Sequence, residues 1–147
     1  MNLFRSMAIS GSALTAERLR LDIIANNIAN VNTTRTAEGG PYRRQMAVFA
    51  PRGEQVQWMY PGIEPNPPFR GEGVRVTGVV QDRAAFKRVY DPGHPDADAT
   101  GYVSLPNVNV VTEMVDLMSA TRAYEANVAA LTAAKTMAER ALEIGRA

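Results

Sequence analysis

An apolar stripe at the start of the chain repeats every seven residues. It consists of Met7, Leu14, Leu21 and Ile28. A repeat of this length is typical of the face along which one α-helix packs against another. Ser10 and Glu17 interrupt the neighbouring positions of the repeat. The pattern predicts a long first helix over about residues 2–32.

A second stripe, in alternating steps of three and four residues, occupies the last third of the chain. It consists of Val110, Met114, Leu117, Thr121, Tyr124, Val128, Leu131, Lys135, Ala138 and Leu142. Asn107 and Asn109 precede this stripe and can cap a helix start, and Gly145 follows it where a helix can end. At ~1.5 Å per residue both helices are longer than a domain of this size needs.

Proline and glycine are concentrated between the two stripes. All nine prolines and nine of the eleven glycines lie from Gly39 to Pro106, and both residues disfavour the interior of a helix. Gln45–Ala50 and Gly73–Val80 carry β-branched residues, alternating in the second segment, and predict strands; Phe86–Tyr90 is a third candidate. The proline-rich segment Pro61–Pro68 predicts a linker or an extended arm.

These patterns predict a mostly α fold with a small β-rich middle. The long N- and C-terminal helices form an antiparallel coiled-coil pair, because neither apolar stripe can stand alone in water, and an irregular β and loop insertion joins them. The expected regions are the N-terminal helix (1–33), the middle with its proline-rich arm (34–106) and the C-terminal helix (107–147). The predicted pairing sets Met7, Leu14, Leu21 and Ile28 against Leu142, Leu131, Tyr124 and Leu117.

Alanine is frequent in the second helix. Nine alanines lie in the 22 residues from Ala120 to Ala141. Alanine fills exposed helix positions at little cost, but it also lets a second helix approach closely. Nine of them beside an apolar stripe suggest that this helix is contacted on more than one side.

Four asparagines crowd the end of the first helix: Asn26, Asn27, Asn30 and Asn32. Asparagine is a poor helix former, so the cluster predicts that the helix stops here. Two interpretations of Asn27 remain open. It is either an ordinary residue of a helix end, or a partly buried amide that hydrogen-bonds neighbouring backbone and fixes the register.

Composition removes several classes of function. The 147 residues carry 16 basic and 15 acidic side chains, a net charge of +1, which gives no reason to expect nucleic-acid binding. The absence of cysteine and the single histidine exclude thiolate nucleophiles, iron–sulfur clusters and three-histidine metal sites. No stretch approaches the ~20 apolar residues of a membrane span, and the first residues lack the continuous apolar segment of a cleavable signal.

One loop gathers an imidazole and three carboxylates: Asp91, Pro92, Gly93, His94, Pro95, Asp96 and Asp98. Such a set could ligate a divalent metal or perform acid–base chemistry, but the same residue types build rigid turns. We expect a structural loop, with no catalytic residue, metal or cofactor. The alternative is a metal-dependent enzyme that uses Asp91, His94 and Asp98. Arg43 and Arg44 could touch phosphate, although such a pair is more often a solvated loop face.

Both ends of the chain resemble the flagellar rod and hook proteins. Residues 12–33 (SALTAERLRLDIIANNIANVNT) are similar to the N-terminal signature of that family, and residues 107–127 (NVNVVTEMVDLMSATRAYEAN) to its C-terminal signature. Gly39–Arg44 and Val89–Asp98 resemble the proximal rod members in particular. The segment Arg35–Tyr42 is longer than the turn of the wider family, and this length fits the proximal rod group.

The resemblance implies a structural subunit of the bacterial flagellar basal-body rod, the drive shaft that transmits motor torque to the hook. It further implies polymerisation through the terminal helices, a periplasmic position, and export by the flagellar type III apparatus without a cleaved signal. The implied partners are copies of itself, other rod proteins and the junction of the membrane ring with the export gate, and no small-molecule substrate is implied. The expected subunit interface consists of Asn26, Asn27, Asn30, Ala123, Ala126, Ala130 and Ala134. The alternative is a soluble helical adaptor or export chaperone that does not polymerise.

Overall fold

The computed structural model describes residues 3–52 and 71–145. Along the chain its elements are α1 (Leu3–Ala29), β1 (Gln45–Pro51), β2 (Val74–Gln81), β3 (Lys87–Tyr90), β4 (Tyr102–Leu105) and α2 (Val110–Ile144). The arm expected at Pro61–Pro68 lies outside the described residues. The helices at the two ends and the small β-rich middle confirm this part of the expected fold.

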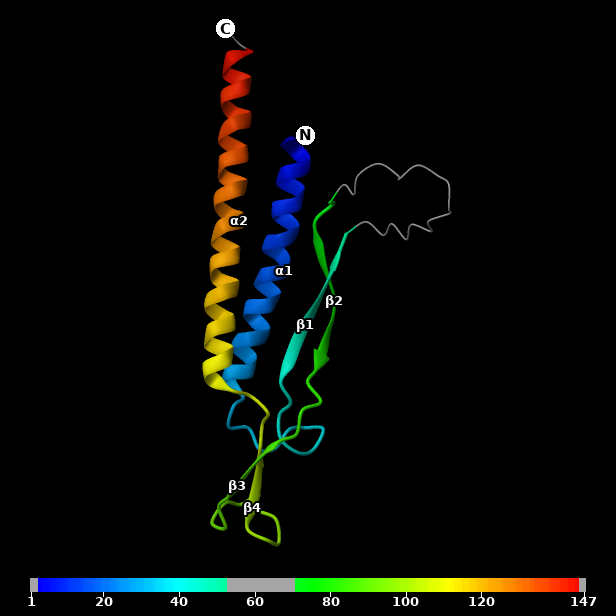
Figure 1. The fold of residues 1–147 in the computed structure, drawn as a ribbon, viewed down its shortest axis with the longest axis vertical. Helices are drawn as coiled ribbons and strands as arrows, with labels where there is room; N and C mark the ends of the chain where they lie inside the picture. Colours follow the sequence, from blue (N-terminus) through cyan, green and yellow to red (C-terminus); the bar gives the residue numbers. More distant parts are fainter. Residues whose placement is uncertain (1–2, 53–70, 146–147) are drawn as a thin grey trace, which may run out of the picture.

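The two helices lie side by side and run in opposite directions (Figure 1). α2 has 35 residues and α1 has 27. α2 starts after Asn109, whose side chain accepts hydrogen bonds from the N–H groups of Val111 and Thr112, so this asparagine is the predicted cap. α1 ends within the asparagine cluster, as its composition predicts.

The strands form two separate antiparallel pairs. β1 pairs with β2, with a bulge between Val48 and Phe49, and β3 pairs with β4. The sequence pattern predicts the first three strands and misses β4. A strand of four residues is too short to show an alternating pattern, and β4 exists because β3 lies beside it. Pro106 follows directly and ends the strand because it has no N–H to donate.

The seam of α2 against α1 contains more than apolar residues. Its buried and partly buried positions recur in steps of four and three: Glu113, Leu117, Ala120, Tyr124, Asn127, Leu131, Ala134 and Ala138. These are the steps of a helix packed along one face. The apolar pattern identifies every second position of this seam. It passes over the positions that hold Glu113, Ala120, Asn127 and Ala134, which are polar or small.

The predicted burial of Leu142 against α1 is wrong. Its side chain is 70% exposed. Because the helices are antiparallel and Asn27 contacts Glu113, Leu3 at the start of α1 lies level with about Met137. Leu142 therefore lies more than one turn beyond the described part of α1, and no described residue of α1 lies opposite it. The other predicted pairing residues are all partly buried, and their pairing with one another stays a prediction.

α1 lies between α2 and the β1–β2 sheet, and its deepest face contacts that sheet (Figure 1). Ser12, Ala16, Ile23 and Asn27 are 6%, 3%, 7% and 1% exposed. At 3.6 residues per turn they lie almost opposite the seven-residue stripe. The hydroxyl of Ser12 accepts a hydrogen bond from the N–H of Val74 at 3.1 Å. This second buried face does not stand out in the sequence, because three of its four residues are small or polar.

Candidate functional site

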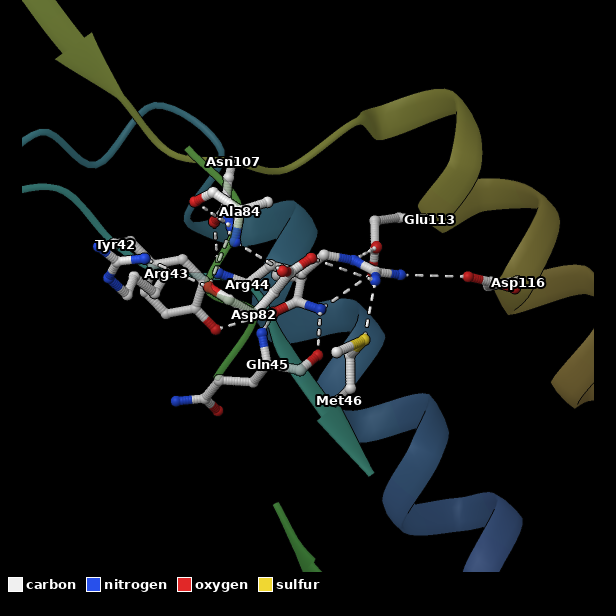
Figure 2. A network of polar contacts seen from close by, with 11 residues as sticks. Tyr42, Arg43, Arg44, Gln45, Met46, Asp82, Ala84, Asn107, Glu113 and Asp116 are labelled. Atoms are coloured by element: carbon white, nitrogen blue, oxygen red, sulfur yellow. Dashed lines mark hydrogen bonds and ion pairs between the residues drawn. The ribbon is translucent and has the colours of Figure 1, made fainter. Parts of the chain in front are cut away.

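A cluster of polar side chains lies where α1, α2 and the β1–β2 sheet meet (Figure 2). We call it the polar junction, and it consists of Asn27, Tyr42, Arg44, Asp82, Asn107, Glu113 and Asp116. Its members come from both helices and from the segments that flank the sheet. The junction therefore connects the β-rich middle to both helices.

Asn27 and Glu113 form the buried centre of the junction. Glu113 is 0% exposed and Asn27 is 1% exposed. The Asn27 Nδ2 donates to Glu113 Oε2 at 3.0 Å and to the Gln45 carbonyl at 2.8 Å. Its Oδ1 accepts from the Gln45 N–H and from the Tyr42 hydroxyl, each at 2.9 Å. Of the two interpretations of Asn27, the buried amide that hydrogen-bonds backbone is correct, and its role in fixing the register stays a prediction.

Arg44 supplies the positive charge that the buried carboxylate needs. Its Nε donates to Glu113 Oε1 at 2.5 Å, its Nη2 to Asp116 Oδ2 at 3.3 Å, and its Nη1 lies 4.0 Å from Asp82 Oδ2. A buried charge is tolerated when it is paired and hydrogen-bonded in this way. The expectation that Arg44 belongs to a solvated loop face is wrong, because its side chain is only 20% exposed and lies among three carboxylates.

Tyr42 and Asn107 fasten two connecting segments to the junction. Burial and, second, the negative charge of Glu113 raise the pKa of Tyr42 above its ordinary value of 10.0. The side chain of Asn107 accepts from the N–H of Arg44 at 2.9 Å and donates to the Asp82 carbonyl at 3.2 Å. Asn107 thus holds the chain that leads into α2, and it leaves the capping of that helix to Asn109.

The loop between β3 and β4 uses its carboxylates to bind its own chain. Asp98 Oδ1 accepts hydrogen bonds from the Thr100 N–H and hydroxyl, at 2.8 and 2.6 Å, and from the Tyr102 N–H at 3.0 Å. The hydroxyl of Thr100 first, then the N–H of Tyr102, lower the pKa of Asp98 from 3.8 to about 2. Asp91 Oδ1 accepts from the Gly93 N–H at 3.2 Å, which closes the turn at the start of the loop.

The middle of the same loop is tied to the segment after α1. Asp96 accepts a hydrogen bond from the Thr34 hydroxyl at 2.8 Å and forms an ion pair with Arg35 at 2.9 Å. The Nδ1 of His94 accepts from the N–H of Asp96 at 3.0 Å. Within residues 3–52 and 71–145, no three histidine, aspartate or glutamate side chains are grouped so that they could hold a metal ion.

The structure separates the residues expected at a subunit interface. Asn26 is exposed, and Asn30 donates to its carbonyl and to its side-chain oxygen, each at 2.9 Å. The four alanines divide as follows: Ala126 and Ala130 are exposed, Ala123 is partly buried, and Ala134 is 5% exposed. The expectation that Ala134 and Asn27 belong to the subunit interface is therefore wrong, because both side chains are already buried within the chain.

Near the start of α2, the side of the helix that faces away from α1 is apolar. We call it the outer face, and it consists of Val111, Met114, Val115 and Met118, which are 71%, 54%, 56% and 55% exposed. Apolar side chains gathered on one exposed face mark an association surface. In the described part of the chain, neither helix combines the length and apolarity needed to cross a membrane.

Comparison with known proteins assigns this arrangement to a family. The family model for flagella basal body rod proteins matches residues 7–35, and the model for the C-terminal part of flagellar basal body rod FlgEFG proteins matches residues 99–144. The rod protein FlgC of Borreliella burgdorferi is 50% identical over 98% of both chains. The chain belongs to the FlgC family of flagellar basal-body rod proteins. It is a structural subunit of the basal-body rod.

Other FlgC proteins match over the same length. FlgC of Bacillus subtilis is 45% identical over 99% of this chain and 100% of its own. FlgC of Escherichia coli O6:H1 is 41% identical over the same shares. Among the junction residues, Asn27 lies in the N-terminal matched segment of this FlgC-family chain, and Glu113 lies in the C-terminal one. The junction therefore joins the two parts that carry the family signatures.

The pattern of apolar residues does not identify the junction as a site. A glutamate one turn into a predicted helix is ordinary, because an acidic side chain there favours the helix dipole. The sequence signal that points to the junction is the position of Glu113 within the helix. Glu113 stands seven residues before Ala120 and four before Leu117, so it occupies the seam where a charge needs a partner.

Proposed function

We propose that this chain polymerises through α1 and α2 into the rod and forms part of the drive shaft that transmits torque to the hook. The observation that carries the proposal is the outer face of α2, four large apolar side chains that are each more than half exposed. Covering an apolar face of this kind removes apolar surface from water, so such a face marks an association site. A rod in which each helix is covered by its neighbours supplies that cover.

The long helices suit a shaft mechanically. Close-packed helices transmit strain with little compression, and α2 spans about 50 Å at ~1.5 Å per residue. In this proposal α1 and α2 pair as an antiparallel coiled coil. The working regions are residues 1–33 and 107–147 for the helical core of the rod, with 34–106 as the β-rich middle and its arm.

The proposed partners are copies of this chain, other rod proteins and the junction of the membrane ring with the export gate. Asn26, Asn30, Ala123, Ala126 and Ala130 are the predicted interface residues that the chain leaves at least partly accessible. We place the subunit in the periplasmic part of the basal body, reached through the flagellar type III apparatus without a cleaved signal. The bonds within the Asp91–Asp98 loop support a structural role for that loop and no catalysis.

Amide hydrogen exchange tests the proposal. A dilute, monodisperse subunit should exchange rapidly near the ends of α1 and α2, since a helix covered on one side recovers little of its ordering entropy. In isolated basal bodies the same amides should be strongly protected. Strong protection at the ends of both helices in the dilute subunit would remove the physical basis of the proposal. Sedimentation against concentration distinguishes a helical adaptor, which would not polymerise.

A further inference from the structure

A groove of about 340 Å³ opens between α1, α2 and β1, next to the polar junction. Its apolar lining consists of Ile23, Ile24, Met46, Ala47 and Phe49, and Arg20 and Asp116 stand among them. The side chain of Phe49 is 37% exposed. The groove is thus an accessible apolar hollow with charged groups at its side.

The charged side chains in and around this groove carry a net negative charge. Arg20 lies 3.7 Å from Glu17 Oε2 and 3.7 Å from Asp116 Oδ1, and Arg44 binds Asp116, Glu113 and Asp82 as described above. The charged side chains that line the groove balance, Arg20 and Arg44 against Glu113 and Asp116. Glu17 and Asp82 pair with the same two arginines from outside the lining and add two negative charges to this network. Glu17 Oε2 accepts no hydrogen bond within the described residues. A partner that seats here gains from bringing a cation with its apolar side chains.

The outer face of α2 has the complementary chemistry. Arg122 continues it one turn beyond Met118, because residues four apart lie on the same side of a helix. The side chain of Arg122 is exposed, and in the part of the chain that the structure describes it makes no ion pair or hydrogen bond. The outer face and Arg122 together form a convex apolar surface that ends in an unpaired positive charge.

We propose that the outer face of one copy of this chain seats in the groove of a second copy, with Met118 against the apolar lining and Arg122 beside Asp116. The inference rests on the proposed function and specifies its contact. One subunit cannot make this contact with itself, because its outer face points away from α1 while its groove lies beside α1. Each copy offers one face and one groove, and such a head-to-tail contact propagates into a helical array unless its rotation closes a ring.

Single cysteines test the contact directly, since the chain contains none of its own. Cells that lack the native copy produce two tagged variants together, Met118→Cys and Ala47→Cys. A disulfide needs Cα atoms within about 7 Å, so mild oxidation of isolated basal bodies should yield a dimer that carries both tags. Met137→Cys replaces Met118→Cys in the control. Met137 is equally exposed, at 58% against 55%, but lies about 28 Å further along α2.

The outcomes separate this contact from the proposed function. A dimer with Met118→Cys and none with Met137→Cys supports the contact. Equal yields from both, or a cross-link from Met118→Cys to a different basal-body protein, overturn it. If Met118→Cys subunits do not enter basal bodies, Val115→Cys on the same face takes their place. The contact is also overturned when basal bodies form with the variants and no dimer appears, and the rod function then still stands. Absence of the unaltered chain from basal bodies would instead refute the proposed function.

A charge reversal tests the role of Arg122. Arg122→Glu should lower the yield of the Met118→Cys and Ala47→Cys dimer, because a negative charge would then face the net negative charge beside the groove. Arg140→Glu is the matched control, since Arg140 is also exposed and lies five full turns along the same side of α2. Loss of the dimer in Arg122→Glu alone supports the contact. Equal loss in both variants, or in neither, contradicts the assigned role of this arginine.

Discussion

The Nδ2 of Asn27 in α1 donates a hydrogen bond to Oε2 of Glu113 in α2, 86 positions further along the chain, at 3.0 Å. Both side chains are buried, and Arg44 and Gln45 from the intervening segment complete their hydrogen bonds. A shift of either helix by one residue would break these hydrogen bonds and leave the buried charge of Glu113 without partners. We therefore expect the contact to specify the register of the helix pair more sharply than apolar packing does.

Asn27→Asp should lower the free energy of unfolding by about 3–5 kcal/mol. The substitution removes the donor to Glu113 and buries a second carboxylate beside it. Chemical unfolding of the subunit, followed by circular dichroism, measures the change. Asn32→Asp is the control, because Asn32 is exposed and its variant should stay within ~0.5 kcal/mol of the parent. Similar losses in both variants would contradict the buried role of Asn27.

Arg44→Met should cost about 3–5 kcal/mol, because it strands the Glu113 carboxylate without a cation. Adding Glu113→Leu to that variant should restore a large part of the loss, since no buried charge then remains. A double-mutant cycle on the free energies of unfolding gives the coupling. Arg88→Met removes the exposed ion pair with Asp98 and should cost under about 1 kcal/mol. Additive effects of Arg44→Met and Glu113→Leu would rule out the coupling.

Gly73→Ala should destabilise the subunit by about 1–3 kcal/mol. Gly73 has φ +99°, and a Cβ there would clash with Oγ of Ser12 on α1. Gly78→Ala, within β2 and five residues after Gly73, is the matched control, because its φ is not in the left-handed region and no atom lies within 4 Å of an added Cβ. Thermal unfolding of both variants checks the contrast. Equal effects would show that the close approach of β2 to α1 does not constrain Gly73.

Leu21→Ala should cost about 2 kcal/mol, near the lower end of the range for buried leucines, because Leu21 is only partly buried. Leu142→Ala should leave the isolated subunit unchanged, since Leu142 is 70% exposed. Unfolding of the two subunits by denaturant distinguishes the sites. A motility assay tests the same substitutions in the assembled rod. Loss of motility in cells that carry Leu142→Ala would show that a neighbour covers this end of α2.

The Asp98 carboxylate should stabilise the β3–β4 loop above about pH 4. Its pKa in the folded chain is about 2, below the ordinary value of 3.8, so the folded state favours the charged form. That contribution is present above pH 3.8 and is lost as the pH falls toward 2. Unfolding midpoints of the parent and of Asp98→Asn should therefore differ at pH 5 and converge near pH 2. A difference that persists unchanged at pH 2 would contradict the assignment.

Much of the architecture follows from local chemistry that a sequence displays. The heptad stripe of Met7 to Ile28 and the absence of proline favour α1, Asn109 starts α2, and the β-branched residues of Val74–Gln81 favour β2. Each of these depends on residues within a few positions of one another. Periodicity and capping therefore predict them without knowledge of the rest of the chain.

The faces and partners of those elements depend on residues far apart in the chain. β4 needs β3, and Leu142 is exposed because the described part of α1 does not reach its level. Arg44 becomes a mostly buried pairing group only because the fold brings Glu113 to it from 69 positions away. A hydrophobic pattern considers only the polarity of each side chain, so it does not predict the burial of Ser12, Asn27 and Glu113. The free energy of a buried polar group depends on the partners that the fold brings to it, and those partners exist only once the helices and the sheet have assembled.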